Sequence, residues 1–211
     1  MPAKKGFESF TDRKTWMRGV RHLKRNDRRL SGLIAKQEYK KRELTHDYCG
    51  ALVSAIIYQQ LAGSAASAIE RRFMALYGGR LPKPEEFLAT GGSRVRSAGI
   101  SPQKYSYIKD LCERITDGRL GLDGFSSMDD ESIIRELDQV RGIGRWTAEM
   151  FLMFSLGRTD VLPADDYGFR KAVMRVYGLR KLPDREKLGS ISRKWAPYRS
   201  IATLCLWQSL K

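Results

Sequence analysis

The sequence predicts an all-α protein, on two observations. Apolar residues recur at spacings of three and four along most of the chain, as they do on one face of a helix. Glycine, proline and capping residues divide these segments into lengths typical of helices, and no segment alternates polar and apolar residues as a strand does. The 211 residues suffice for one domain, or for two small helical lobes that share a cleft.

Start and stop signals place the helices of the first half of the chain. Trp16, Val20 and Leu23 give the first helix its apolar face. Ser64 is a candidate N-cap, and Ser101-Pro102 combines a capping serine with a proline at the first helical position. In chain order we expect helices over residues 12–26, 46–60 and 64–77, a short helix that Pro82 and Pro84 introduce and Gly91-Gly92 ends, and a helix from Ser101 to about Gly118.

The second half of the chain continues in the same way. Its most apolar run, Met150 to Phe154, has no polar face and therefore predicts a central core helix. We expect helices from Ser127 and Asp130 to about Leu137, from about Trp146 to Gly157, from about Asp166 to Tyr177 with a stop at Gly178, and two final helices that Pro183-Asp184 and Pro197 open.

The chain is strongly basic, which bears on its partners. Lysine and arginine number 39 against 24 acids, so the net charge is +15 and the isoelectric point is about 9.9. Residues 1–46 carry 14 of the bases and 5 of the acids. Such a surplus attracts polyanions, although a merely basic protein is an equally good reading of the charge alone. Because no apolar run approaches the length of a membrane span, nucleic acid is favoured over a membrane.

The three cysteines, Cys49, Cys112 and Cys205, are far apart and form no paired motif. Their spacing indicates neither a disulfide framework nor a zinc or iron–sulfur site. We therefore expect free thiols in a reducing compartment, and no cofactor that the chain requires.

Gly142-Ile143-Gly144 forms a short turn between two predicted helices, with Arg141 and Arg145 beside it. Two glycines let a backbone turn sharply and approach another molecule closely. Amide groups there, together with a helix N-terminus, can bind a phosphate. A tight helix–helix turn uses glycine for purely structural reasons as well, so this motif alone leaves both readings open.

Asp165-Asp166 follows this hairpin by about twenty residues and precedes a predicted helix. One aspartate can cap that helix. A fixed carboxylate that faces a DNA cleft can also stabilise the oxocarbenium-like sugar that forms when an N-glycosidic bond breaks, or orient a water molecule toward it. Spacing alone does not choose between these two roles.

Four segments together resemble the helix-hairpin-helix DNA glycosylases that carry a Gly/Pro-rich loop and an aspartate. They look closest to the alkylbase branch, the 3-methyladenine DNA glycosylase II type. The resemblance covers about residues 45–210 in order. It rests on VRGIGRWTAEMFLMFSLGRTDVLPADDYGFRKAV (Val140 to Val173), IIYQQLAGSAASAI (Ile56 to Ile69), SAGISPQKYSYIKDL (Ser97 to Leu111) and WAPYRSIATLCLW (Trp195 to Trp207).

The resemblance implies roles for individual residues. The family's catalytic aspartate falls on Asp166, which leaves Asp165 as a neighbour or a cap. Trp146 and Trp207 fall on aromatic positions that line the base pocket, where an electron-deficient alkylated purine stacks well; core packing is the other reading of each. Leu61, next to Gln60, falls where the family places the wedge that fills the hole left by a flipped nucleotide, unless it only ends a buried helix.

Backbone carbonyls at the hairpin bind a monovalent cation in some relatives, and the resemblance places them at Asp138, Val140 and Ile143. The chain also departs from the family at several positions. Relatives that cut the DNA strand carry a lysine just after the hairpin, where this chain has Trp146, so we expect no lyase activity. Met150 stands where some relatives place a pocket tyrosine, which puts their substrate range in doubt here. The iron–sulfur cysteine loop and the long N-terminal β domain of other branches are absent from the sequence, and Arg141 replaces a frequent proline.

We thus expect two helical lobes of this glycosylase fold with a DNA-binding cleft between them. Residues 1–45 are expected to form a basic helical segment that packs on the core or on DNA, and 46–211 the core, with the helix-hairpin-helix at about 129–157. The expected activity is excision of alkylated purines such as 3-methyladenine and 7-methylguanine from double-stranded DNA, which leaves an abasic site. Alternatives are a non-catalytic DNA-binding module and a glycosylase for deaminated or oxidised bases. We expect a monomer in the cytoplasm or nucleoid of a prokaryote, or in the nucleus of a eukaryote.

Overall fold

The computed structural model describes residues 7–35, 39, 41 and 43–210, and parts of the predicted N-terminal segment lie outside them. Over these residues the chain is helical and forms no strand, only one isolated bridge between Ser9 and Arg158. The all-α prediction is confirmed. The chain divides into two compact units, which we call the middle unit (residues 45–151) and the terminal unit (residues 1–44 and 152–211).

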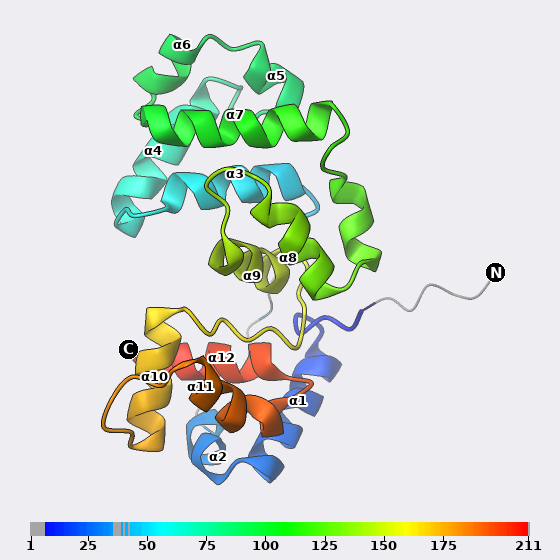
Figure 1. The fold of residues 1–211 in the computed structure, drawn as a ribbon, viewed down its shortest axis with the longest axis vertical. Helices are drawn as coiled ribbons and strands as arrows, with labels where there is room; N and C mark the ends of the chain where they lie inside the picture. The colour runs from blue at the N-terminus through cyan, green and yellow to red at the C-terminus, as the bar shows by residue number, and fades with distance from the viewer. Residues whose placement is uncertain (1–6, 36–38, 40, 42, 211) are drawn as a thin grey trace, which may run out of the picture. The chain divides into compact units, whose positions relative to one another are not determined.

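The middle unit is built around one long helix, α7, which packs against α3, α5 and α6 (Figure 1). Ser101 caps α7 as predicted, because its hydroxyl oxygen accepts the Lys104 N–H at 3.2 Å and Pro102 follows at the first helical position. The core of this unit includes Ile56 of α3 and Ile108 of α7, both fully buried. The unit contains α3 (Tyr48–Tyr58), α4 (Gly63–Ala75), α5 (Pro84–Leu88), α6 (Gly92–Ser97), α7 (Pro102–Thr116), the 3-10 helix η1 (Leu122–Ser127), α8 (Asp130–Asp138) and most of α9 (Arg145–Phe154).

In the terminal unit, α12 packs against α1, α2 and α10 (Figure 1). Gly19 lets α1 approach α12 closely, because a Cβ there would lie 2.4 Å from the Ile201 Cδ1 atom. Trp195 is fully buried in this core and packs edge-on against Phe169 of α10. The unit contains α1 (Arg13–Asn26), α2 (Arg28–Ile34), α10 (Tyr167–Tyr177), α11 (Arg185–Ser192), η2 (Arg193–Trp195) and α12 (Arg199–Gln208).

Asp27 organises the polar interior of the terminal unit. It lies between α1 and α2, and its Oδ1 accepts the Arg29 N–H at 3.0 Å and the Leu30 N–H at 3.3 Å. Its Oδ2 accepts hydrogen bonds from the Tyr177 hydroxyl and, at 2.8 Å, from the Trp195 indole. A carboxylate that is only 1% exposed is thereby kept charged inside the protein.

The structure corrects several sequence predictions. Ser64 is not an N-cap, because α4 begins at Gly63 after Ala62, which makes no side-chain cap. The short helix does not reach Gly91-Gly92, because α5 ends at Leu88 and Gly92 begins the separate helix α6. Asp129 caps α8 in place of Ser127. Three short elements, α2, α6 and η1, were not predicted at all.

Helix α9 differs from its prediction in exposure. Its apolar run predicted burial on every side, and Phe151, Leu152 and Met153 are indeed buried. Trp146 and Phe154, however, are 43% and 44% exposed. None of the helices in the described part of the chain is long and apolar enough to cross a membrane.

Candidate functional site

The hairpin lies in the middle unit between α8 and α9. Glycine is present at positions 142 and 144 for different structural reasons. Gly142 has φ +81°, and a Cβ there would lie 2.1 Å from the Tyr107 Cδ2 atom. A Cβ at Gly144 would meet nothing within 4 Å. Ile143 is 2% exposed, and its N–H donates to the Val140 carbonyl at 3.0 Å. Gly142 is therefore required by packing, whereas Gly144 leaves space open for another molecule.

Asp110, a residue of α7, binds the backbone of the hairpin. Asp110 Oδ2 accepts the Arg141 N–H at 2.9 Å and the Arg114 Nε at 3.0 Å. Burial raises the pKa of Asp110, but these hydrogen bonds and the nearby charges of both arginines outweigh it and hold the pKa below its ordinary value. Asp110 is therefore ionised when it anchors the turn.

The remaining amide groups of the hairpin are available to a ligand. Among the described residues, the N–H groups of Gly142, Gly144 and Arg145 have no acceptor. Successive unpaired amides at the start of α9 make a site of positive potential that suits a phosphate oxygen. Phosphate binding by these amides stays a prediction.

The two arginines beside the hairpin differ. Arg145 forms paired hydrogen bonds with Glu131 at 3.0 and 2.6 Å and lies 3.6 Å from Glu149. Arg141 has a side chain that is 62% exposed, with its Nε 3.5 Å from Asp110. Arg141 therefore reaches solvent more freely than Arg145.

The segment after α3 holds the predicted wedge residues. Gln60 has φ +57°, a left-handed conformation that is uncommon outside glycine. Leu61, which follows it, is 39% exposed, and Tyr58 before it is 37% exposed. Leu61 therefore does not end a buried helix: it projects from a turn.

Asp166 lies at the start of α10 in the terminal unit. Its Oδ1 accepts the Phe169 N–H at 2.5 Å, which makes it the N-cap, and the Trp207 indole N–H at 2.8 Å. A Cβ at Gly168 would lie 3.3 Å from the same oxygen, so a small residue there keeps this side of the carboxylate open. Asp165 is exposed and pairs with Arg185 instead.

Trp207, which contacts Asp166, also packs against another aromatic side chain of the terminal unit. Trp207 stacks on Phe154, with ring centroids 6.2 Å apart and planes 18° from parallel. Phe154 is 44% exposed and Tyr167, adjacent to Asp166, is 64% exposed. Neither residue was predicted as a site residue. Phe154 belongs to an all-apolar run, which does not reveal the uncovered face of its helix, and no motif marks Tyr167.

The predicted site residues thus fall into two groups. Asp166 and Trp207 are brought into direct contact in the terminal unit. The middle unit holds the hairpin with Arg141 and Arg145, the Gln60–Leu61 turn, and Trp146 and Met150 on α9.

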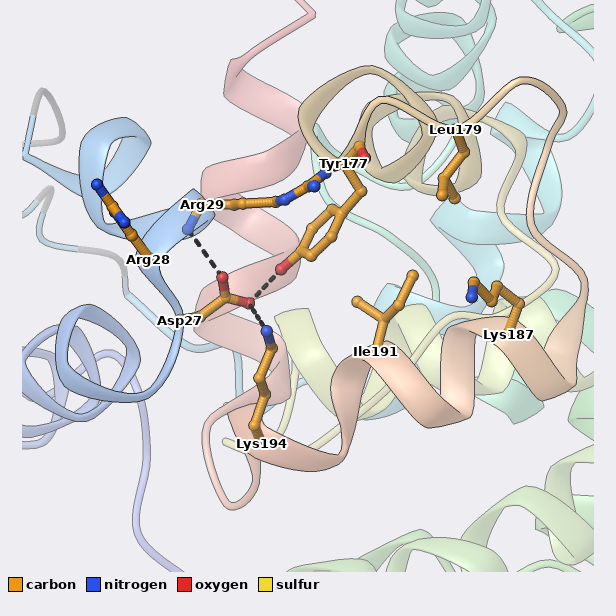
Figure 2. Close-up of a pocket in the computed structure, with 8 residues that line it drawn as sticks. All are labelled: Asp27, Arg28, Arg29, Tyr177, Leu179, Lys187, Ile191 and Lys194. Atoms are coloured by element: carbon orange, nitrogen blue, oxygen red, sulfur yellow. Dashed lines mark hydrogen bonds and ion pairs between the residues drawn. The ribbon is translucent and has the colours of Figure 1, made fainter.

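A pocket of about 760 Å³ lies at the opposite end of α10, beside Tyr177 (Figure 2). Lys194 Nζ lies 3.2 Å from Asp27, and the Arg29 guanidinium donates to the Tyr177 carbonyl. The 11 residues of α10 separate this pocket from Asp166 by about 16 Å at 1.5 Å per residue. The buried carboxylate of Asp27 and two of the cations at this pocket interact with other groups of the chain. We therefore conclude that these groups stabilise the folded terminal unit and do not form a ligand site.

Comparisons with known proteins agree with this arrangement. The family model of the HhH-GPD superfamily base excision DNA repair protein matches residues 53–197. The chain is 33% identical to DNA-3-methyladenine glycosylase 1 of Schizosaccharomyces pombe, over 90% of this chain and 84% of that protein.

Two solved structures are similar over nearly their whole length. One is the crystal structure of a DNA-3-methyladenine glycosidase from Bacillus halodurans, with a TM-score of 0.82 and 36% identity over 96% of this chain and 91% of that one. The other is the 3-methyladenine DNA glycosylase Mag1 of Schizosaccharomyces pombe in complex with abasic DNA, with a TM-score of 0.79 and 32% identity over 91% and 96%. The chain therefore belongs to the HhH-GPD superfamily of base excision DNA repair proteins.

Proposed function

We propose that the protein is a monofunctional DNA glycosylase that excises alkylated purines such as 3-methyladenine and 7-methylguanine. The observation that carries the proposal is Asp166, a carboxylate that accepts hydrogen bonds from the Phe169 N–H and from the indole of Trp207, whose ring stacks on the exposed Phe154. Relatives that are named 3-methyladenine glycosylases support the choice of substrate class.

The chemistry follows from the charge of the substrate. In a cationic alkylated purine, the bond between the sugar C1′ and the base nitrogen breaks with both electrons going to the base, which leaves neutral. The sugar becomes an oxocarbenium-like cation, and the Asp166 carboxylate stabilises it electrostatically. Water adds to C1′ and loses a proton to the carboxylate or to solvent, which leaves an abasic site. Because the base is already a good leaving group, one carboxylate and a stacking surface are a sufficient set of groups.

Absence of strand cleavage is part of the proposal. A lyase step needs an amine that attacks the sugar C1′ and forms a Schiff base. Trp146 stands at the position that the resemblance assigns to that lysine, and it lies in the first turn of α9. Reaction of the wild-type protein with methylated DNA is expected to give free base and alkali-labile sites, with no nicked strand before alkali is added.

DNA binding is assigned to the middle unit. The unpaired hairpin amides are suited to a phosphate, and the exposed Leu61 to a gap in the base stack. The Mag1 relative was solved in complex with abasic DNA, which supports DNA binding by this protein. We also infer a monomer that works where chromosomal DNA lies: the cytoplasm or nucleoid of a prokaryote, or the nucleus of a eukaryote.

A monovalent cation fits the carbonyl groups at the hairpin. The Val140 carbonyl accepts one hydrogen bond, from the Ile143 N–H, and an oxygen with two lone pairs can still face an ion. With the carbonyls of Asp138 and Ile143 it would supply the neutral oxygen donors that sodium or potassium takes. Such an ion would add positive charge near a bound phosphate, and no step of base removal passes through it.

Replacement of Asp166 by Asn tests the catalytic assignment. Asparagine caps a helix as well as aspartate does, so the fold is expected to survive. The variant is expected to release methylated purines at least about a hundredfold more slowly, since it loses the charge that stabilises the sugar cation. The measurement is chromatography of bases released from methylated DNA in single-turnover experiments.

Asp165→Asn is the matched control, because it makes the same chemical change one residue away at a side chain that pairs with Arg185. This control is expected to keep nearly full activity. If Asp166→Asn releases methylated purines at the wild-type rate, the catalytic assignment is wrong. If the wild-type protein binds DNA but releases neither alkylated, deaminated nor oxidised bases, the protein is a binding module instead.

A further inference from the structure

The turn that carries Leu61 is attached to the rest of the middle unit by a lysine. Lys104 Nζ donates to the carbonyl oxygens of Ile57 at 2.6 Å and of Gln59 at 2.8 Å. These carbonyls belong to the last turn of α3 and its C-cap, where no further helical N–H can reach them. Lys104 therefore ends α3 and fixes the backbone from which the turn departs.

The surroundings of Lys104 indicate that it positions the end of α3 and does not serve as the partner of a carboxylate. Burial lowers the pKa of Lys104, and no carboxylate of the described residues pairs with it. A positive charge at a helix C-terminus is stabilised by the carbonyl dipoles that point toward it. Lys104 is thus bound by carbonyl oxygens at the α3 terminus, close in sequence to the left-handed residue Gln60.

A second contact joins the same turn to the hairpin. The Gln59 side chain donates from Nε2 to the Gly142 carbonyl at 2.8 Å. Gln59 is only partly buried, so this bond is a specific link and not part of the core. Gln59, which directly precedes the left-handed residue Gln60, thus contacts the hairpin that carries the unpaired amides.

Helix α7 serves as the common support of both segments. Lys104, Tyr107 and Asp110 are spaced by three residues and therefore lie on one face of the helix. The first binds the α3 terminus, the second occupies the space where a Cβ of Gly142 would lie, and the third binds the Arg141 N–H. A single helical face thus sets the positions of the turn and of the hairpin.

We propose that Lys104 and Gln59 are positioning residues that fix the Leu61 turn relative to the hairpin. Binding of a DNA phosphate at the hairpin then determines where Leu61 enters the duplex. The inference rests on the proposed function, because it takes Leu61 as the wedge and the hairpin as the phosphate site. It adds the residues that couple them. A left-handed conformation is unfavourable for a residue other than glycine. The Lys104 bond to the Gln59 carbonyl and the Gln59 side-chain bond to Gly142 hold the backbone next to Gln60 in place.

The experiment compares two affinities of each variant for DNA. Fluorescence anisotropy measures dissociation constants for intact duplex and for the same duplex with a stable abasic analogue, which offers the gap that the wedge fills. Lys104→Met and Gln59→Met remove the donors while keeping similar length. Each is expected to lower the preference for abasic over intact DNA, by about tenfold for Lys104→Met and less for Gln59→Met, with little change in binding to intact duplex.

Lys109→Met is the matched control. It removes the same charge from the same helix at an exposed residue that pairs with Glu113 at 3.4 Å. It is expected to leave the preference for abasic DNA unchanged. Gln59→Met also guards against misfolding, since Gln59 lies near the surface and its loss is not expected to unfold the protein.

A double-mutant cycle with Leu61→Ala decides whether the two residues act through the wedge. Once Leu61 is removed, Lys104→Met and Gln59→Met are expected to have no further effect on the preference. Equal effects in both backgrounds, or no effect in either, would overturn the inference.

The failure of the wedge assignment can be recognised separately. If Leu61→Ala by itself leaves the preference for abasic DNA intact, Leu61 is not the wedge and the inference falls with it. Release of methylated purines by the wild-type protein, which the binding assay does not involve, then shows whether the glycosylase assignment still stands.

Discussion

At the scale of single residues, one oxygen atom of Asp166 accepts two hydrogen bonds. Its Oδ1 accepts the amide that caps α10 and the Trp207 indole N–H. The sequence offered helix capping and catalysis as alternatives, and the geometry makes them compatible, because a cap is a rigid way to hold a carboxylate. Trp207 likewise has two contacts, one through its N–H and one through its stacked ring.

The two contacts of Trp207 can be separated by mutation. Trp207→Phe keeps an aromatic ring next to Phe154 but removes the indole N–H. The rate of base release at saturating enzyme is expected to fall by about tenfold, because a hydrogen bond to a charged group contributes about 1.5–3 kcal/mol. Affinity for abasic DNA is expected to change little. Single-turnover kinetics and anisotropy check the two parts.

Phe154→Leu makes the complementary change, because it leaves both hydrogen bonds of Asp166 in place. Its loss of aromatic surface is expected to weaken discrimination of alkylated from normal purines, with a smaller effect on the rate for a good substrate. A Trp207→Phe variant with wild-type kinetics would show that the indole N–H does not support the carboxylate.

At the scale of elements, local sequence signals predicted some boundaries and missed others for a physical reason. Ser101 and Gly178 act within a few residues of themselves, as cap and as left-handed stop, so their helix ends were predictable. The short helices α2 and α6 are too short to be stable alone, and packing of Leu30 and Val95 into the core supports them. No window of sequence contains that information.

The candidate site shows the same limit. The resemblance pointed to Asp166, the hairpin and Leu61, each of which carries a local motif. It did not point to the contacts of Lys104 with α3, because Lys104 and Gln59 are joined only by the packing of α7 on α3. The exposure of Phe154 was hidden for the same reason.

The two hairpin glycines give an element-scale prediction. Gly142→Ala places a methyl group against Tyr107 at a positive φ, so it is expected to destabilise the protein by at least about 1–2 kcal/mol and to weaken DNA binding. Gly144→Ala meets no protein atom and is expected to change stability by less than about 0.5 kcal/mol. Urea denaturation measures the free energy of unfolding of both variants, and fluorescence anisotropy with duplex DNA measures their affinity for DNA.

Gly144→Ala is the more informative of the pair. If a phosphate approaches the Gly144 backbone, the added methyl group weakens DNA binding in a protein of normal stability. Unchanged DNA affinity in this variant would move the phosphate contact away from Gly144. Normal stability of Gly142→Ala would contradict the packing role of Tyr107.

At the scale of the whole molecule, the terminal unit joins segments from the two ends of the chain. The N-terminal helix α1 packs on α12, and α2 packs on both α10 and α12. Asp27 links them, since Tyr177 ends α10 and Trp195 precedes α12. The stability of the unit that holds Asp166 therefore depends on a carboxylate far from it in sequence.

Burial raises the pKa of Asp27, but hydrogen bonds from Tyr177, Trp195 and the Leu30 N–H outweigh it and hold the pKa below its ordinary value of 3.8. The folded protein thus binds the proton less readily than the unfolded chain does. This contribution to stability is complete above about pH 4 and is lost as the pH falls through the lowered pKa. Asp27→Asn removes the charge and is expected to cost about 2–3 kcal/mol at pH 7.

The pH dependence distinguishes a buried charge from simple packing. At pH 7 the wild-type protein is expected to have the larger free energy of unfolding. The difference from Asp27→Asn is expected to narrow toward pH 3, because Asp27 binds a proton more readily in the unfolded chain than in the folded protein. Urea denaturation of both proteins at the two pH values measures this difference. Asp12→Asn, at a surface helix cap, is the control and is expected to show only a small difference at either pH. If wild type and Asp27→Asn differ in free energy of unfolding by the same amount at pH 7 and at pH 3, the charge of Asp27 does not contribute to stability. Asp27 would then join the two ends of the chain through its shape and not through its ionisation.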